Sequence, residues 1–414
     1  MPHIPSAPRL RLVVIGDEIL LGRIQDTNTA WLADRSLGWG LRLAGVAVVG
    51  DEQQAIVASL RAAVASAELV IVTGGLGPTE DDRTRDALAE LMAVPLVEDA
   101  AAWQQIVGYY RRIRGRRGVP RSNRRQAQIP AGATTLVNDR GTAPGLLARI
   151  DGALVACLPG VPHEMQAMAD RLAADLPRQL TGLVVPHVAE IHFGGLGESS
   201  AQDRLGDLLA DRRLQIGICA HDGLYMTVRI VGARTPVARR AAAIRRVMRP
   251  YLLPEPGFAP SLVALLAQRG ERITVAESCT GGAIAAQLTA VPGASAVFEQ
   301  GLIAYHNRVK QDVLGVPAQL IARHGVVSGP VVEAMATGAL AWSGASLAVA
   351  ASGIAGPGGG SPDKPVGTVW IAVAQGTTVR SRRLHLAGSR ERIQARAAAS
   401  ALHLAWQQLT GAGS

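Results

Sequence analysis

Aromatic residues, cysteines and long apolar runs are all scarce in this chain of 414 residues. Aromatic residues make up 3% of it, so the hydrophobic cores must be built mainly from alanine, valine, leucine and isoleucine. No stretch offers about 18 uninterrupted apolar residues, which argues against a membrane-spanning helix. The first residues, MPHIPSAPRLRLVVIGDE, lack the long apolar region and the small-residue cleavage site of a secretory signal. We therefore expect a cytoplasmic protein without a membrane partner.

The cysteines are too few and too far apart for a disulfide framework or a metal site. Cys157, Cys219 and Cys279 match no metal-binding spacing, and their odd number argues against a set of disulfides. Cys157 and Cys219 each lie in an apolar run that is typical of a strand. We expect both of these side chains to be buried in hydrophobic cores.

Arginine supplies almost all of the positive charge, and the formal net charge is +9. Many of the arginines are concentrated in YYRRIRGRRGVPRSNRRQA, residues 109–127. Such a cluster can bind nucleic acid, but a solvated helix end and loop is the commoner origin of a charged run. A third interpretation is an anion pocket for a phosphorylated small molecule, because guanidinium groups match phosphate oxygens. We expect no nucleic-acid partner and leave the role of residues 111–125 open.

The length exceeds what one hydrophobic core usually supports, so two or three domains are expected. Buried-strand patterns at 10–16 and 67–75 enclose helical patterns at 28–40 and 51–67. Strands that alternate with helices predict an α/β fold, in which a mainly parallel or mixed sheet is covered on both faces. The predicted first domain spans residues 1–175.

The sequence pattern changes after this domain. Residues 183–252 predict a strand, a helix, a second strand and a second helix, which together make a small α+β unit assigned to 176–254. The segment 252–261, which contains proline and glycine, is a linker. A second full α/β pattern occupies 258–414 and ends in a long helix at 389–409.

The segment TVAESCTGGAIAAQL, residues 274–288, places three potential nucleophiles at one strand-to-helix corner. Ser278, Cys279 and Thr280 follow a buried strand, at the edge where α/β proteins bind ligands. The alternative is an ordinary N-cap cluster that holds the start of a helix, and the motif alone does not decide between the two. The long glycine- and proline-rich loop at 351–370 favours a functional site, because loops of this length in compact domains are usually functional.

A serine nucleophile needs a base, and no His–Asp pair is spaced for a triad. Lys310 follows a strand predicted at 296–307, and a desolvated lysine can lose its proton and take that of Ser278. Tyr305, at the end of the same strand, would relay the proton or position the substrate. The backbone N–H groups of Gly281 and Gly282 are potential donors to an oxyanion or a phosphate.

Several motifs of this region resemble, in order and spacing, the C-terminal domain of the CinA family. They are ESCTGG, VPGASAVF, YHNRVK, HGVVS, SGIAGPGGGSPDKPVGTVW and a terminal amphipathic helix, and the resemblance covers about 258 to 410. It implies a nicotinamide mononucleotide (NMN) amidohydrolase that forms nicotinic acid mononucleotide and ammonia and needs no cofactor. Ser278 is the first candidate for the nucleophile and Thr280 the second, whereas Cys279 is a packing residue. The predicted substrate-binding residues are Glu277, Thr280, Gly281, Gly282, Asn307, Gly353, Gly356 and Gly358.

The N-terminal half carries a second candidate site in TGGLGPTEDD, residues 73–82. Its glycine amides can cradle a phosphate or an acidic group; the glycines are Gly74, Gly75 and Gly77. Nearby carboxylates can hold a divalent metal that bridges to phosphates; they are Asp51, Asp81 and Asp82. The alternative is that these carboxylates only cap helices and complement helix dipoles.

This half resembles the molybdopterin-binding, MoaB/MogA-like domain in the version found at the N-terminus of CinA proteins. The matching pieces are IGDEILLGRIQDTN, VGDE, TGGLGPTEDDRT, NRRQAQIP, GTAPG and LPGVPHEM. The resemblance implies a pyrophosphatase that cleaves ADP-ribose to AMP and ribose 5-phosphate, with Mg²⁺ or a similar divalent ion and with Thr79 at the substrate. Two departures from the usual pattern are Asp17, in place of a threonine, and His163, in place of a small residue. Whether this half is active in the present chain is left open.

The middle unit resembles the KH-like connector of CinA but lacks the GXXG clamp of RNA-binding KH domains. The resemblance also implies a homodimer with small-molecule nucleotides, NMN and ADP-ribose, as its ligands. A different class of function remains open at this point. In that alternative the chain is a binding protein whose front domain holds a pterin or a nucleotide and which acts in competence or the DNA-damage response.

Overall fold

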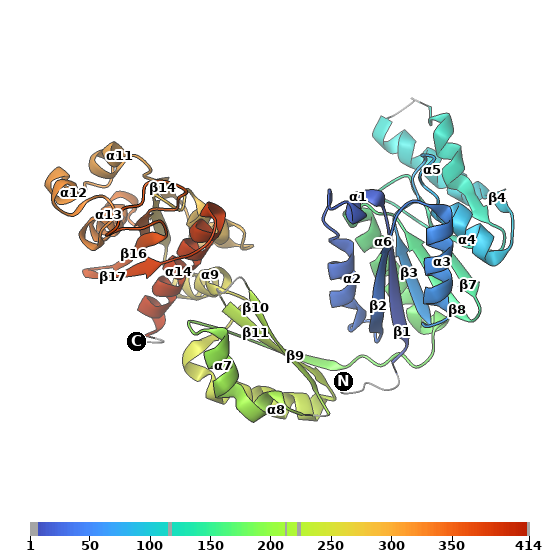
Figure 1. Cartoon of the computed structure of the whole chain (residues 1–414), viewed down its shortest axis with the longest axis horizontal. Coiled ribbons are helices and arrows are strands. Elements are labelled where there is room, and N and C mark those ends of the chain that lie inside the picture. The colour runs from blue at the N-terminus through green and yellow to red at the C-terminus, as the bar shows by residue number, and fades with distance from the viewer. Residues whose placement is uncertain (1–6, 115–117, 212, 222–224, 412–414) are drawn as a thin grey trace. The chain divides into compact units, whose positions relative to one another are not determined.

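The computed structural model of the chain describes residues 7–114, 118–211, 213–221 and 225–411. Its contacts divide the chain into two compact units, with the division between Pro186 and His187. Each unit combines helices with its own sheets (Figure 1). The predicted α/β class is therefore confirmed. Within the described ranges, no helix is both long enough and apolar enough to cross a membrane.

The first unit is built on a six-stranded sheet with the order β2-β1-β3-β8-β7-β6. β2, β1, β3 and β8 pair in parallel, whereas β7 and β6 join antiparallel. Every residue of β3 is buried, as expected for a central strand covered on both faces. The strands are Arg9–Ile15 (β1), Arg42–Val49 (β2), Leu69–Thr73 (β3), Thr134–Leu136 (β6), Gly145–Ile150 (β7) and Ala153–Leu158 (β8).

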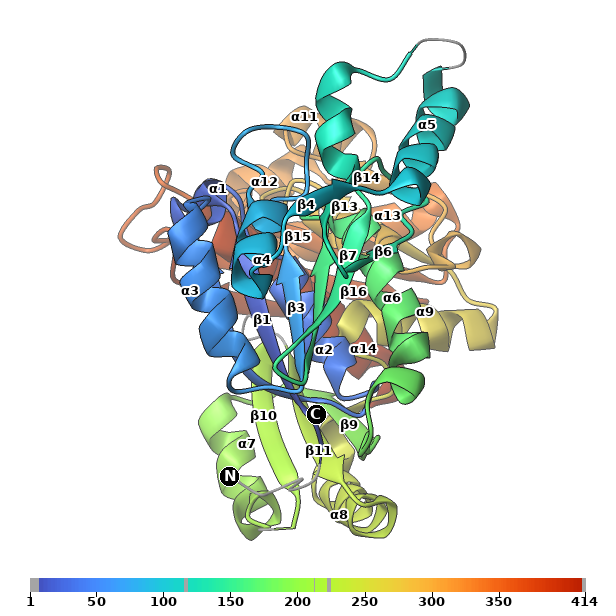
Figure 2. The same ribbon diagram turned by 90° about the vertical axis from the view of Figure 1, so that its right-hand side faces the viewer.

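Helices cover both faces of this sheet, and Figure 2 shows α3 and α6 on opposite sides of β1 and β3. Leu60 of α3 packs in one core with Val70, and Met165 of α6 packs in the other core with Ile71. The helices are Asn28–Ser36 (α2), Gln53–Val64 (α3), Thr84–Met92 (α4) and Pro162–Gln179 (α6). The predicted domain end at residue 175 falls inside α6, because this helix continues for four more residues.

Smaller elements complete the first unit. They are Asp17–Leu20 (α1), Leu96–Glu98 (β4), Ala100–Arg114 (α5), the 3₁₀ helix Arg121–Ala127 (η1) and Gln128–Pro130 (β5). β4 pairs antiparallel with β5. A small core of Ala102, Ile106 and Ala127 joins α5 to η1.

The second unit begins with a four-stranded antiparallel sheet in the order β10-β11-β9-β12. Its elements are His187–Gly194 (β9), Glu198–Leu205 (α7), Gly206–Leu209 (η2), Gln215–His221 (β10), Tyr225–Gly232 (β11), Arg234–Val247 (α8), Arg249–Tyr251 (η3) and Leu252–Leu253 (β12). The predicted strand–helix–strand–helix order missed β10 and β12. The prediction of a buried Cys219 was wrong, because β10 is an edge strand and Cys219 lies on its exposed face. Cys157, in contrast, is buried as predicted.

The remainder of the second unit surrounds a five-stranded sheet in the order β14-β13-β15-β16-β17. β14, β13 and β15 are parallel, and β16 and β17 extend the sheet antiparallel. The strands are Ile273–Glu277 (β13), Gly301–Ile303 (β14), Leu347–Gly353 (β15), Thr368–Gln375 (β16) and Thr378–His385 (β17). The helices are Phe258–Arg269 (α9), Ala283–Thr289 (α10), Ala294–Ala296 (η4, a 3₁₀ helix), Asn307–Asp312 (α11), Ala318–His324 (α12), Gly329–Ser343 (α13) and Arg390–Thr410 (α14).

Both faces of this sheet are covered mainly by alanine and branched aliphatic side chains, as the composition predicts. Helices α9, α10 and α14 supply one core, and α13 supplies the other. β14 is much shorter than the strand predicted at 296–307. After Ile303 the chain leaves the sheet, so the backbone carbonyls of Ala304 and Tyr305 have no strand partner and are available to a side chain.

Candidate functional site

Ser278 and Lys310 lie side by side at the carboxyl edge of the five-stranded sheet. Ser278 is the first residue after β13, and its N–H donates to Ala351 O at 2.9 Å, which fixes it beside β15. The Lys310 Nζ donates to Ser278 Oγ at 3.1 Å and to Ala304 O at 2.7 Å. The lysine is 1% exposed and the serine 9% exposed. The structure thus brings the predicted base into hydrogen-bond distance of the predicted nucleophile.

The environment of Lys310 lowers the pKa of its amine. Its third acceptor is Tyr305 O at 3.3 Å, so all three partners are neutral oxygens and none is a carboxylate. Burial lowers the pKa of Lys310 below its ordinary value of 10.5. An uncharged amine at this distance can accept the hydroxyl proton of Ser278 as the oxygen attacks a substrate.

The lowered pKa of Lys310 predicts a pH-dependent stability. Between the folded pKa and 10.5 the unfolded chain binds more protons than the folded chain, so the free energy of unfolding rises with pH. This contribution of Lys310 to the free energy of unfolding is fully present above pH 10.5, and it is lost as the pH falls through the pKa of Lys310 in the folded chain. We expect the thermal midpoint of the wild type, relative to that of Lys310→Met, to increase as pH rises through this window. A difference that stays constant across the window would show that the lysine titrates alike in the folded and unfolded chains.

Glu277, predicted to bind substrate, has a structural role instead. Its side chain is fully buried at the end of β13. The carboxylate accepts hydrogen bonds from the backbone N–H groups of Gly282 (3.0 Å), Ile284 (3.1 Å) and Ala285 (2.8 Å). It therefore caps the N-terminus of α10 from behind the sheet edge, where a substrate cannot reach it.

The same turn settles which backbone donors are engaged. Gly281 N donates to Ser278 O at 3.1 Å, and Gly282 N donates to the Glu277 carboxylate. The prediction that these two glycine N–H groups bind an oxyanion was therefore wrong, because both are already engaged. Within the part of the chain that the structure describes, the N–H groups of Cys279 and Thr280 have no acceptor. These two N–H groups are the available donors next to Ser278.

The side chains of Cys279 and Thr280 differ in role. Cys279 packs in the core beneath the turn, and burial raises the pKa of its thiol to about 12, which makes it a poor nucleophile. Thr280 is 2% exposed, and its hydroxyl has no partner among the described residues. Lys310 donates to the hydroxyl of Ser278 rather than to that of Thr280. This geometry favours Ser278 as the nucleophile.

Arg390, which sequence reasoning missed, links two predicted parts of the site. Its guanidinium donates to the Tyr305 hydroxyl at 2.9 Å and to Gly356 O at 2.7 Å. Tyr305 is 58% exposed, so this bond holds a ring that faces solvent. Arg390 is the first residue of α14, where the helix dipole disfavours a cation. That mismatch was the available sequence signal for a functional arginine.

The remaining predicted residues lie around the same edge in different roles. Asn307 begins α11 and is exposed. Gly353 is needed for strand packing, because a Cβ there would lie 2.8 Å from Thr368 O on β16. Gly358 has open space around it in the loop between β15 and β16.

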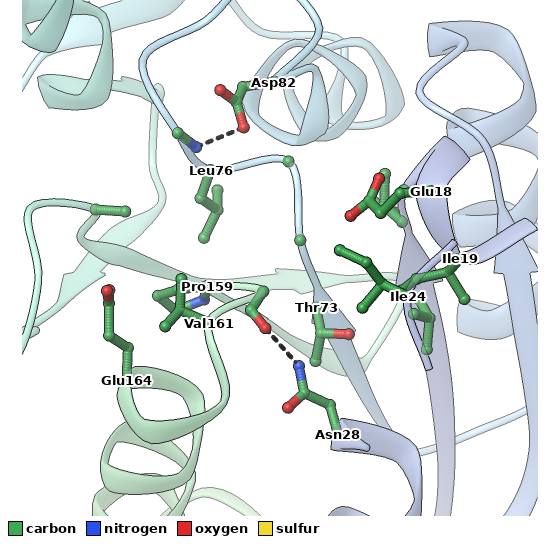
Figure 3. A pocket seen from close by; sticks show the side chains of 18 of the residues that line it. Glu18, Ile19, Ile24, Asn28, Thr73, Leu76, Asp82, Pro159, Val161 and Glu164 are labelled. Carbon is green, nitrogen blue, oxygen red and sulfur yellow. Dashed lines mark hydrogen bonds between the residues drawn. The ribbon is translucent and has the colours of Figure 1, made fainter. Parts of the chain in front are cut away.

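The second candidate site is a cavity of about 550 Å³ in the first unit (Figure 3). It lies at the carboxyl ends of the parallel strands, and the predicted Gly74, Gly75 and Gly77 line it. Two buried polar atoms in its wall, Asn28 Oδ1 and Thr73 Oγ1, have no partner among the described residues. Since buried polar groups are normally satisfied, these atoms suit a polar ligand. The cavity therefore fits a small molecule with hydrogen-bonding groups.

Asp82 and Thr79, predicted at the metal and the substrate, hold the glycine loop together. Asp82 accepts from Gly77 N at 2.7 Å and from Thr79 N at 2.8 Å, and its carboxylate also accepts from the Thr79 hydroxyl. Arg85, which is 1% exposed, donates to the carbonyl oxygens of Leu76 and Gly77 from the other side. The Asp82 carboxylate thus holds the loop, and Asp82 also lines the same cavity as Asp51 and Asp81.

Asp82 should therefore matter for stability. We expect Asp82→Ala to lower the free energy of unfolding of the first unit by about 1–3 kcal/mol, because charge-assisted hydrogen bonds to the loop are lost. The exposed Asp81→Ala should change it by less than about 0.5 kcal/mol. Chemical denaturation, with hydrogen exchange of the loop amides, measures both. Equal effects of the two variants would reject the capping role.

Asp51 and Asp17 tie the ends of β1 and β2 together. Asp17 N donates to Asp51 Oδ2 at 3.0 Å, and Asp51 N donates to Asp17 Oδ1 at 3.4 Å. Burial raises the pKa of Asp51, and the charges of Asp17, Glu18 and Asp81 raise it further, although the Asp17 N–H opposes this. No group of three histidine, cysteine or acidic side chains in the described chain is arranged to hold a metal ion. Asp51 and Asp81 do not form a complete protein site for Mg²⁺. They fit the common arrangement in which one or two carboxylates bind the ion together with substrate phosphates and water.

The arginine-rich segment is partly engaged in ion pairs. Arg124 pairs with Glu98 at 3.0 Å, and Arg125 pairs with Asp86 at 2.8 Å. Residues 115–117 lie outside the described residues. Arg124 and Arg125 thus each have a carboxylate partner at the surface of the first unit.

Comparisons with known proteins cover nearly the whole chain. The model of the CinA C-terminal domain matches residues 257–409, and the model described as a probable molybdopterin binding domain matches residues 11–178. A CinA-like protein of Akkermansia muciniphila is 43% identical over 373 residues, which cover 88% of this chain and 89% of the relative.

Two solved structures are also similar. CinA of Thermoplasma acidophilum is 32% identical over 41% of this chain and 99% of its own, with a TM-score of 0.38. The competence damage-inducible protein A of Klebsiella pneumoniae is 38% identical over 37% of this chain and 94% of its own, with a TM-score of 0.36.

Proposed function

The chain belongs to the CinA family, and from that membership we propose that its second unit hydrolyses the carboxamide of NMN to nicotinic acid mononucleotide and ammonia. The observation that carries the proposal is the buried amine of Lys310, 3.1 Å from Ser278 Oγ. A lysine with only neutral partners in a buried position has a lowered pKa, as a base requires. Amide hydrolysis through a serine needs such a base and no cofactor.

The first half of the reaction forms an acyl-enzyme. Ser278 Oγ attacks the amide carbon while the uncharged Lys310 amine takes the hydroxyl proton. The carbonyl oxygen becomes an oxyanion, and the free N–H groups of Cys279 and Thr280 are its donors. The Lys310 ammonium then gives its proton to the amide nitrogen, the C–N bond breaks, and ammonia leaves.

The second half regenerates the enzyme. Water attacks the acyl carbon, Lys310 takes one proton from it, and the C–O bond to Ser278 breaks as this proton passes to Oγ. Nicotinic acid mononucleotide then departs. Tyr305 presents an exposed ring, held by the hydrogen bond from Arg390, on which the pyridinium ring of the substrate can stack.

The test is a direct assay of the full-length chain with NMN. Ammonia is measured by a coupled enzyme assay and nicotinic acid mononucleotide by chromatography, with and without EDTA. We expect equal molar release of both products, unchanged by the chelator, because no metal takes part in the proposed steps. An absence of product above the protein-free blank would overturn the proposal.

For the first unit we propose a metal-dependent ADP-ribose pyrophosphatase, with the cavity as its substrate site. The unpartnered Asn28 Oδ1 and Thr73 Oγ1 support a polar ligand, and the glycine loop supports a phosphate. Mg²⁺, held by Asp51 and Asp81 together with the substrate phosphates, would neutralise the pyrophosphate and supply an activated water. Formation of AMP from ADP-ribose should stop in EDTA and return with Mg²⁺. Hydrolysis that continues in the chelator would reject the metal.

The binding alternative makes a different prediction for both assays. A chain that only holds a pterin or a nucleotide and acts through partners would bind ligand in the cavity without turnover. Such a chain would yield neither ammonia from NMN nor AMP from ADP-ribose. We also propose that the chain forms a homodimer, as the family resemblance implies, and light scattering measures its molar mass.

A further inference from the structure

Lysine is nearly absent from this chain, and both of its lysines lie in the second unit. Of the 42 basic residues other than histidine, only Lys310 and Lys364 are lysine. Arginine supplies every other side chain of this kind, and Lys310 lies where a proton must be released. Lys364 lies in SPDKP, in the loop between β15 and β16, and has no part in the chemistry described above.

The contacts of Lys364 place it at the same sheet edge as Ser278. Its Nζ donates to His324 O at 3.1 Å, at the end of α12. Val326 lies two residues after His324, and its carbonyl oxygen accepts from the Ser352 hydroxyl at 2.9 Å. Ser352 directly follows Ala351, whose carbonyl oxygen accepts from Ser278 N. Since β13 and β15 are parallel, their carboxyl ends share this edge.

Lys364 has no carboxylate partner among the described residues. Its one side-chain hydrogen bond goes to a neutral carbonyl. A strongly hydrated ammonium held by a single carbonyl retains donors for a further acceptor. This cation is therefore available to an anion.

The loop that carries Lys364 adds backbone donors. Within the described chain, the N–H groups of Gly358, Gly359 and Gly360 have no acceptor, and all three residues are exposed. A Cβ at Gly360 would lie 2.9 Å from Val366 N, so this glycine is needed where the two limbs of the loop approach each other. Consecutive free N–H groups beside a cation form a common anion-binding arrangement.

Two arginine hydrogen bonds, called tethers below, hold the loop between β15 and β16, one on its first half and one on its second half. Arg390 donates to Gly356 O in the first limb, and Arg383 donates to Asp363 O at 2.9 Å in the second. Between these tethers lie the three glycines with free N–H groups and, beside the second tether, Lys364. The free donors therefore have a defined place at the edge of the candidate active site.

We infer that Lys364 and the N–H groups of residues 358–360 bind the phosphate of a nucleoside monophosphate substrate. The inference rests on the proposed function, because it assigns the phosphate of the molecule whose carboxamide Ser278 attacks. It makes Lys364 a specificity residue, which distinguishes the phosphorylated substrate from the corresponding nucleoside.

The test compares NMN with nicotinamide riboside, which lacks the phosphate, on the full-length chain. Lys364→Met should raise KM for NMN by roughly 10- to 100-fold, with kcat little changed and with kinetics for the riboside unaltered. Lys364→Arg should stay close to the wild type. Arg383→Met, which removes a tether of the same loop without touching the phosphate, should affect both substrates alike. If Lys364→Met also affects both substrates alike, or neither, the inference is wrong.

A binding experiment separates this inference from the proposed function. NMN and nicotinamide riboside are titrated calorimetrically into full-length Ser278→Ala and into Ser278→Ala with Lys364→Met. Binding of the phosphate compound that depends on Lys364 supports the phosphate site even if NMN is not hydrolysed. Equal binding to both proteins overturns the site even if NMN is hydrolysed.

Discussion

Replacing Ser278 with alanine is expected to lower kcat for NMN deamidation by at least about 10³-fold. Without Oγ no acyl-enzyme can form, and the N–H groups of Cys279 and Thr280 can only polarise the amide towards attack by water. The fold should be preserved, because among the residues that the structure describes the Ser278 side chain makes one hydrogen bond, to Lys310. The measurement is the steady-state rate of ammonia release, with circular dichroism and NMN binding as checks on folding.

Thr280→Val is the matched control for this variant. The Thr280 hydroxyl is buried and has no partner among the described residues, so its removal should leave stability nearly unchanged. We expect its kcat to remain within about tenfold of the wild type. A loss in Thr280→Val as large as that in Ser278→Ala, or a fully active Ser278→Ala, would exclude Ser278 as the nucleophile.

Substitution of Lys310 should be as damaging as substitution of Ser278, and it should change the pH profile. In the wild type, kcat/KM should rise with pH through the lowered pKa of Lys310, because only the uncharged amine takes the serine proton. Lys310→Arg retains a charge that cannot be removed in the accessible pH range, so it should be inactive at every pH. Lys310→Met should be inactive as well, with at most a shallow dependence on hydroxide.

The arginine variant separates chemistry from simple loss of charge. A structural lysine that only bridges Ser278 and Ala304 would be replaced in part by arginine, which would then restore activity at neutral pH. Activity in Lys310→Arg above about 1% of the wild type would contradict a base at this position. A wild-type kcat/KM that does not fall as the pH is lowered below 10.5 would also contradict a base at this position.

The pairing of Ser278 with Lys310 was accessible from the sequence because it depends on two regular features. Parallel strands end at a common sheet edge, and polar residues directly after a buried strand collect there. Ser278 follows β13, and Lys310 follows β14, the neighbouring strand. Sequence reasoning therefore placed the two residues near each other although 32 positions separate them.

Side chains that serve the backbone could not be recognised in the same way. Glu277 and Asp82 are acidic residues beside glycines, and in the sequence they resemble ligands of substrate and metal. In the structure they accept hydrogen bonds from nearby N–H groups. Whether a carboxylate faces a cavity or its own loop depends on local dihedral angles that composition and spacing do not determine.

Contacts between distant segments were also beyond sequence reasoning. Arg390 lies 85 positions from Tyr305 and meets it only because α14 packs against the sheet beside α10. Cys219 lies in an apolar run, but the position of β10 at the sheet edge leaves one of its faces exposed. In both cases the tertiary arrangement, rather than the local pattern, decides the environment of the side chain.

The most direct test of the account is the titration of Lys310 itself. A chain with only two lysines, labelled with ε-¹³C-lysine, should give two resonances, and the Lys364→Arg variant leaves one of them. We predict that the remaining resonance titrates clearly below 10.5, at the pH of the acidic limb of the kcat/KM profile. A resonance that titrates at or above 10.5 would mean that Lys310 is an ammonium at working pH and cannot deprotonate Ser278.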